Sequence, residues 1–261
     1  MVQRRTVTVA PTLVRMAEIY SLARTGGRRS PRFAAYMAQV EQHWGLAAFN
    51  PMAGEQATAA VDALITLDAE EAARESAQKA LDLCEWRDPI TLAVVVPTPG
   101  MWTDRLATEA RHRTVADRRP EHGEIQLWST DVPRMETILM ESAAEAVRTI
   151  WTSRHGLALT LHAVLAREGL AYAFNPGDLT EHTNDAPVID AIEVLGDTST
   201  EGDMIAVLYG DAAAIALGYT PLGIEDRAGQ QFAVRRARRL VARLGMAGAL
   251  RAGASAISWY D

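Results

Sequence analysis

One short run of apolar residues limits the folds that this chain can adopt. Residues 90–96 read Ile-Thr-Leu-Ala-Val-Val-Val, a β-branched run that is typical of a buried strand. Pro89 precedes the run, and Pro97, Pro99 and Gly100 end it. Because helical patterns dominate the residues before it, we predict an α/β or α+β fold in which helices pack against a small sheet.

Helical spacing characterises the N-terminal third. Apolar residues between 13 and 20 lie at helical spacing, and Ser30 followed by Pro31 is typical of a helix start. Two more helices are predicted, one after the turn at residues 50–54 and one over about residues 68–85. A helical N-terminal third is therefore predicted to precede the sheet.

Helices and strands alternate after the first strand. Two strand-like segments in this region are joined by a loop with a glycine at each end, so we predict that they pair antiparallel. The whole pattern predicts a small mixed sheet of four or five strands with flanking helices. The predicted elements are strands at 124–128, 189–195, 204–209 and 256–260, and helices at about 131–156 and 230–244.

Length and pattern leave two domain organisations open. We predict one domain that spans residues 1–261, because mixed domains of this size are common. The change of character at Pro89 indicates an alternative, a helical region at 1–88 followed by an α/β region at 89–261. The polar stretch at 175–186 is the best candidate for a linker.

The charge balance and the single cysteine exclude several classes of protein. The chain has 33 acidic and 26 basic residues, and this net charge of −7 argues against broad, non-specific binding to nucleic acid. Cys84 is the only cysteine, so neither an internal disulfide nor a cysteine-rich zinc site can form. No run is long enough to span a membrane, and residues 6–10 are too short and too polar for a signal-peptide core. We therefore expect a cytoplasmic protein that does not bind a membrane.

A polar segment directly after the buried strand is the first candidate site. Ligands in α/β folds bind beyond the carboxyl ends of the strands, and residues 98–112 lie there. A helix that begins near Thr103 would place Arg105, Glu109 and His112 on one face. The alternative is an ordinary exposed helix in which Arg105 and Glu109 form a surface ion pair.

The functional interpretation of this segment is a site for a small anion. Trp102 and Arg105 are predicted to bind the anion, with the guanidinium as its charged partner. Histidine titrates near neutral pH, so an imidazole with a neighbouring carboxylate can transfer protons. The residues predicted to do so are Asp104, Glu109 and His112.

A second junction at residues 207–212 is predicted to contribute to substrate binding. Tyr209 and Asp211 stand where a predicted strand leads into an alanine-rich helix. The alternative is that Asp211 simply caps that helix. The junction lacks the second and third glycines of a dinucleotide-binding fingerprint, so the sequence names no cofactor.

Metal binding is not predicted. Glu109 and His112 have a spacing that occurs in carboxylate metal sites, but no His-Glu-x-x-His pattern is present. No two histidines lie within one turn of a predicted helix.

Several short motifs resemble an uncharacterised bacterial protein family that has no assigned function. The resemblance is spread over most of the chain and carries no substrate, cofactor or catalytic residue. It implies one co-folded unit. The residues that carry it are Glu18-Ile19-Tyr20, Ser30-Pro31-Arg32-Phe33, Phe49-Asn50-Pro51-Met52, Trp102-Thr103-Asp104-Arg105, Leu208-Tyr209-Gly210-Asp211 and Leu217-Gly218-Tyr219.

Two functions remain open at the level of sequence. The first is an enzyme that acts on a small anionic substrate through the Arg, Glu and His residues after the first strand. The second is a non-enzymatic protein that binds a partner or assembles as a homo-oligomer, with tryptophans at its interfaces. Those tryptophans would be among Trp44, Trp86, Trp128 and Trp151.

Overall fold

The computed structural model describes residues 6–25, 29–47, 49–99, 105–114, 121–174 and 184–260, with the backbone alone at 111–114. These residues form a mostly helical structure with a small parallel sheet, which confirms the predicted fold class. The chain divides into two compact units. We call them the sheet unit (Met1–Ala80, Arg87–Arg105 and Glu121–Ala146) and the helical unit (Leu81–Trp86, Leu106–Pro120 and Val147–Asp261). The prediction of one domain remains a prediction.

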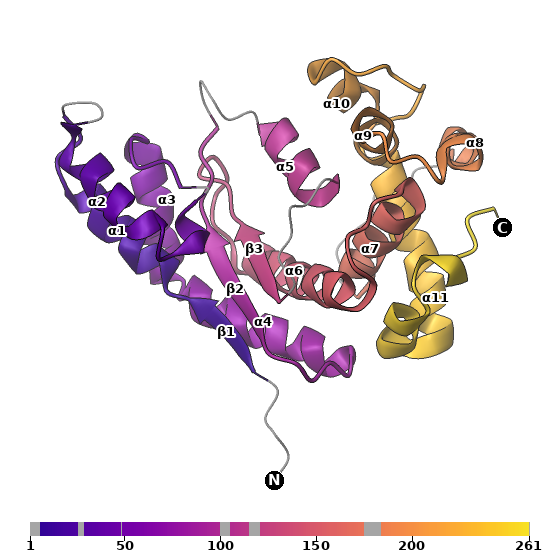
Figure 1. Ribbon diagram of the computed structural model, residues 1–261, viewed down its shortest axis with the longest axis horizontal. Coiled ribbons are helices and arrows are strands. Elements are labelled where there is room, and N and C mark those ends of the chain that lie inside the picture. The colour runs from indigo at the N-terminus through magenta and orange to yellow at the C-terminus, as the bar shows by residue number, and fades with distance from the viewer. Residues whose placement is uncertain are drawn as a thin grey trace, which may run out of the picture. The chain divides into compact units, whose positions relative to one another are not determined.

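The sheet unit is built around the predicted strand. β2 (Ile90–Val95) lies between β1 (Val7–Ala10) and β3 (His122–Gln126), and all three strands are parallel (Figure 1). Val7 aligns with Ile90, and Val95 aligns with Gln126. Residues 92–95 are fully buried, which explains why the run is apolar on both faces.

Helices in the sheet unit follow the predicted patterns closely. α1 (Thr12–Ser21) buries Leu13, Met16, Ile19 and Tyr20, and α2 (Pro31–Val40) begins at Ser30, whose hydroxyl accepts a hydrogen bond from the Arg32 amide. The other elements are the short η2 (Trp44–Leu46), α3 (Glu55–Thr66), most of α4 (Ala69–Leu83) and the first part of α6 (Met135–His155).

Two contacts fix the start of α1 over the sheet. The Thr12 hydroxyl donates to the Val94 carbonyl at 2.6 Å, and the Leu13 amide donates to the Glu70 carboxylate at 2.8 Å. η2 also approaches β2 closely, because a Cβ on Gly45 would lie 2.5 Å from the Ala93 side chain. These contacts join the β1–α1 junction, η2 and β2 into one packed group.

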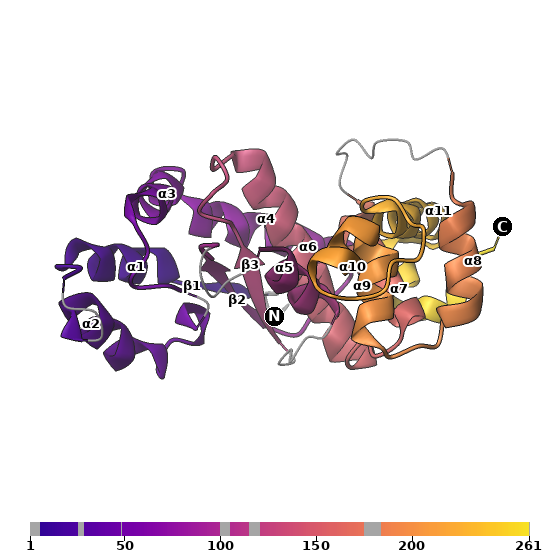
Figure 2. The ribbon, with the colours of Figure 1, turned by 90° about the horizontal axis from the view of Figure 1, so that it is seen from above.

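The helical unit centres on two closely packed helices, α7 (Leu161–Ala173) and α11 (Ala228–Ala252) (Figures 1 and 2). A Cβ on Gly169 would lie 2.5 Å from the Ala233 carbonyl oxygen, so the two backbones touch there. The unit also holds the rest of α6 and most of α5 (Arg105–Thr114). The remaining elements are α8 (Ala186–Leu195), α9 (Glu201–Tyr209), α10 (Asp211–Ala216) and η3 (Ala254–Ala256).

Three of the predicted strands were wrong. Residues 189–195 and 204–209 lie in helices α8 and α9, and residues 256–260 form no strand. In α8 the buried residues Val188 and Ile192 are four apart while Val194 is 82% exposed, which is a helical pattern. The run from Met204 to Tyr209 is buried throughout, and such a run does not distinguish a helix from a strand. The sheet formed by the described residues therefore has three strands instead of four or five.

Candidate functional site

The sequence-predicted site residues have partners in different units. Arg105 belongs to the sheet unit, where its guanidinium binds Asp131 through two hydrogen bonds of 2.6 and 2.8 Å and lies over the Trp128 ring. Glu109 belongs to the helical unit, where it is buried with its carboxylate 3.6 Å from Arg227. Trp102, Asp104 and the His112 side chain lie outside the described residues. Their predicted roles therefore remain predictions.

The structure brings two predicted residues together at the second junction. The hydroxyl of the buried Tyr209 donates to the Glu109 backbone carbonyl at 3.4 Å. Asp211 serves the local backbone, because its carboxylate accepts hydrogen bonds from the amides of residues 222–224. Asp211 thus anchors the loop between α10 and α11.

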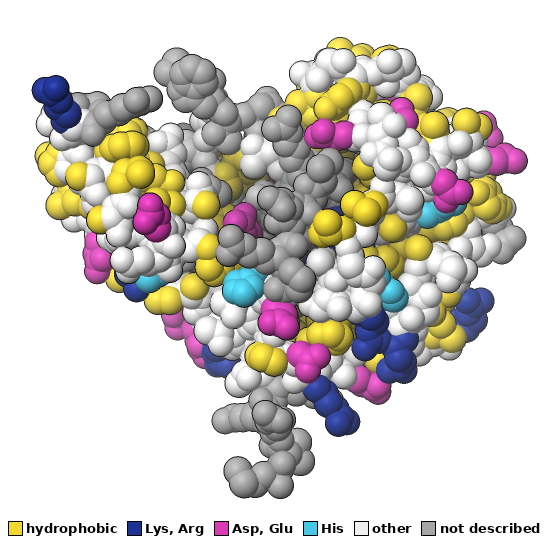
Figure 3. Space-filling view, in the orientation of Figure 1, with side chains coloured by type: hydrophobic (Ala, Val, Ile, Leu, Met, Phe, Trp, Pro, Cys, Tyr) yellow, Lys and Arg dark blue, Asp and Glu magenta, His cyan; other side chains and the backbone are white. Residues whose placement is uncertain are grey.

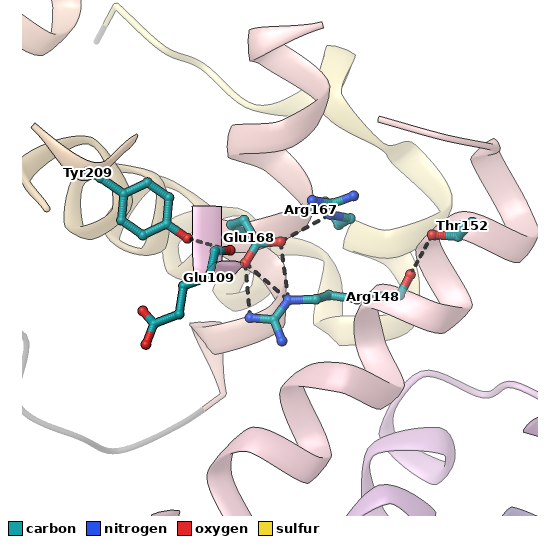
Figure 4. Close-up of polar contacts among 6 residues, drawn as sticks. All are labelled: Glu109, Arg148, Thr152, Arg167, Glu168 and Tyr209. Atoms are coloured by element: carbon teal, nitrogen blue, oxygen red, sulfur yellow. Dashed lines mark hydrogen bonds and ion pairs between the residues drawn. The ribbon is translucent and has the colours of Figure 1, made fainter. Parts of the chain in front are cut away.

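A cluster of buried charges in the helical unit was not predicted. Figure 4 shows Arg148 of α6 and Arg167 of α7 converging on the carboxylate of Glu168. The Arg148 guanidinium lies 2.9 Å from Glu168, and Arg167 Nε lies 3.0 Å from it. The exposed fractions of the Arg148, Arg167 and Glu168 side chains are 2%, 1% and 0%. We call these three residues the buried charge cluster.

The helix that carries two members of the cluster explains why they are buried. α7 is buried over nearly its whole circumference, so the charged residues at 167 and 168 lie inside the unit. Charges in an interior are stable only when they are paired, and the three side chains meet this requirement together. The sequence did contain a signal, since Arg167 and Glu168 interrupt an otherwise apolar helix.

A small pocket in the sheet unit follows the end of β1. Its volume is about 100 Å³, and we call it the β1 pocket. It lies where β1 leads into α1 and where the chain enters η2. The lining residues are Ala10, Pro11, Thr12, Arg15, Gln42, His43, Trp44 and Gly45.

The β1 pocket is lined by one permanent cation, Arg15, and one imidazole, His43. No lining residue is acidic. Within the described part of the chain, no carboxylate is paired with the Arg15 or His43 side chain. The Trp44 ring meets the His122 ring edge to face at 5.4 Å, which holds one wall in place.

Glu70 is an acid that contacts a lining residue, Thr12. Its carboxylate accepts a hydrogen bond from the Leu13 amide at 2.8 Å and lies 3.3 Å from the hydroxyl of Thr12, which makes its shorter hydrogen bond to the Val94 carbonyl. Burial raises the pKa of this carboxyl, while its hydrogen bonds act in the opposite direction. Glu70 therefore occupies the amide end of α1 that would otherwise attract an anion.

Sequence reasoning missed the β1 pocket because it missed β1. With residues 7–10 assigned to a helical region, the strand-to-helix junction at Ala10 and Thr12 was not recognised. Arg15 and His43 are separated by a whole helix and its connections, so no local pattern joins them.

The arginine-rich helix α11 interacts mainly with its own unit. Arg235 pairs with Asp185, and Arg238 donates to the Ala173 carbonyl. Arg236 is buried with its guanidinium over the Phe232 ring. On the face drawn in Figure 3, basic side chains stand among acidic and uncharged ones. Arg235 and Arg238 are thus engaged by residues of the helical unit, and Arg236 by α11 itself.

Cys84 is buried, and burial raises the pKa of its thiol to about 12, so it is a poor nucleophile. Among the residues that the structure describes, no group of three or more His, Cys, Asp or Glu side chains could hold a metal ion. None of the described helices has both the length and the apolar character that crossing a membrane requires.

Comparisons with protein-family models, with curated proteins and with solved structures find no significant match to this chain.

Proposed function

We propose that this protein binds a small oxyanion, a phosphate, sulfate or carboxylate group, in the β1 pocket. The observation that carries the proposal is Arg15, an arginine that lines the pocket and has no acidic partner among the described residues. Arginine binds planar and tetrahedral oxyanions through two parallel hydrogen bonds. A bound anion would pair with this available positive charge.

The location and size of the pocket support this ligand class. The pocket follows the carboxyl end of a parallel strand, the edge where α/β proteins bind ligands. Its volume of about 100 Å³ is well below the roughly 300 Å³ at which pockets for drug-sized molecules begin. It therefore suits a single anionic group, with any larger part of the ligand outside.

His43 extends the chemistry that the pocket supports. An imidazole beside a bound oxyanion can donate a hydrogen bond to it and can exchange a proton with it. The proposal thus keeps the small anionic substrate class and assigns it to Arg15 and His43.

Calorimetric titration of the full chain with sulfate and with phosphate tests the proposal. Arg15→Gln is expected to weaken binding at least about tenfold, because a hydrogen bond to a charged group contributes roughly 1.5–3 kcal/mol. Arg24→Gln is the matched control, since Arg24 is an exposed arginine of the same unit outside the pocket lining. Circular dichroism checks that both variants are folded.

Two results would overturn the proposal. One is equal affinity of wild type and a folded Arg15→Gln variant. The other is the absence of saturable binding for both anions in the wild type.

A further inference from the structure

We infer that anion binding in the β1 pocket is coupled to proton uptake, with His43 as the group that gains the proton and Glu70 as the charge that opposes the anion. The inference rests on the proposed function and adds its regulation. It follows from the two kinds of charge at the pocket: Arg15 is permanently cationic, whereas histidine changes its charge between pH 5 and 8.

A bound anion and a protonated His43 stabilise each other. The anion would occupy the small space that His43 lines. Because no lining residue is acidic, none of them neutralises the imidazolium in place of the ligand. By linkage, a ligand that favours the protonated form binds more tightly as the pH falls.

Glu70 opposes the same anion from outside the pocket lining. Thr12 is shared, since it lines the pocket and its hydroxyl contacts the Glu70 carboxylate. While Glu70 is ionised, its charge repels an anion next to Thr12, and protonation removes this repulsion. The raised pKa of Glu70 agrees with a carboxyl that protonates more readily than an exposed one.

The titratable groups other than Arg15 on the elements around His43, Glu41 and Glu124 among them, lie outside the pocket lining. On α1, Glu18 is exposed and Tyr20 is buried, and neither lines the pocket. On α2, Arg32 donates to the carbonyls of residues 20 and 22, and Tyr36 lies against aromatic rings. β2 has no titratable residue. His122 of β3 contacts Trp44 and is the second imidazole of this region.

Sulfate is the appropriate probe, because its own charge does not change over the tested pH range. Calorimetry of the full chain at several pH values, in buffers with different ionisation enthalpies, measures both affinity and proton uptake. We expect the affinity to rise by up to about tenfold for each unit that the pH falls through the histidine range. We also expect a net uptake of protons on binding.

Two pairs of variants assign the effect to named groups. His43→Gln should flatten the pH profile and abolish most of the proton uptake, whereas His122→Gln should leave the slope unchanged. Glu70→Gln should bind sulfate at least about twofold more tightly at neutral pH. Glu71→Gln is its matched control on α4, because Glu71 is exposed and pairs with Arg74.

The possible outcomes separate this inference from the proposed function. Binding that depends on Arg15 but not on pH would overturn the inference and leave the proposed function standing. An unchanged slope in His43→Gln would also overturn it. Binding of neither sulfate nor phosphate at any pH would overturn both.

Discussion

The buried charge cluster and the β1 pocket are both centred on arginine, but their environments differ. In the cluster, Arg148 and Arg167 share the carboxylate of Glu168, and all three side chains are almost inaccessible to solvent. In the pocket, Arg15 is partly exposed and no lining residue is acidic.

The difference teaches how burial decides the role of a charge. A buried guanidinium costs several kcal/mol in lost hydration, so the protein itself must supply the compensating carboxylate. A guanidinium in an open pocket keeps its hydration and needs no internal partner, so its charge stays available to a ligand. The cluster is therefore structural, and the pocket is the site where binding is expected.

Removal of Glu168 should have the largest effect. Glu168→Ala leaves two buried arginines without their shared acid and is expected to lower the free energy of unfolding by about 3–5 kcal/mol in urea denaturation. Glu71→Ala breaks an exposed ion pair and should leave the stability close to wild type. If Glu168→Ala does not fold, Glu168→Gln should still unfold at lower urea than Glu71→Ala. Equal stability of the Glu168 and Glu71 variants would contradict the structural role of the cluster.

A smaller loss of stability is expected at the helix contact beside the cluster. Gly169→Ala places a methyl group 2.5 Å from the Ala233 carbonyl oxygen, so α7 and α11 must separate. We expect a loss of about 1–3 kcal/mol in the same urea measurement. Gly54→Ala is the control, because its added methyl group would meet no atom nearer than 3.7 Å. If Gly169→Ala unfolded at the same urea concentration as wild type, the packing between α7 and α11 would be loose at this contact.

The smallest effect is expected at Glu70, beside the pocket, and depends on pH. Burial raises the pKa of Glu70 above its ordinary value of 4.5, so folding favours the protonated carboxyl. That stabilisation is fully present below pH 4.5 and is lost as the pH rises through the folded-state pKa. Glu70→Gln keeps an acceptor for the Leu13 amide and should be slightly more stable than wild type near neutral pH. Urea denaturation should show a smaller difference in stability between Glu70→Gln and wild type near pH 4 than near pH 7. An advantage that is the same at both pH values would contradict the raised pKa.

Sequence patterns predicted the elements whose signals are local. β2 was predicted from a β-branched run between prolines, and α2 from a serine followed by a proline. α6 lies within the helix that was predicted at about residues 131–156. α9 was misassigned because its residues are buried all round, so their spacing carries no period.

The two regions of interest depend on long-range contacts. Thr12 and Val94 are 82 residues apart, and their hydrogen bond helps to form the junction at which the β1 pocket lies. Arg148 and Glu168 come from different helices, and nothing in either helix specifies the pairing.

Local sequence patterns were thus sufficient to predict the fold class, most helices and the central strand, because each of these depends on residues that are neighbours in the chain. Tertiary packing decided which arginines are neutralised inside the protein and which face a pocket. The physical reason is that hydration and ion pairing depend on neighbours in space. Arg15 and Arg167 are the same residue type, and only their surroundings make one available to a ligand and the other part of the interior.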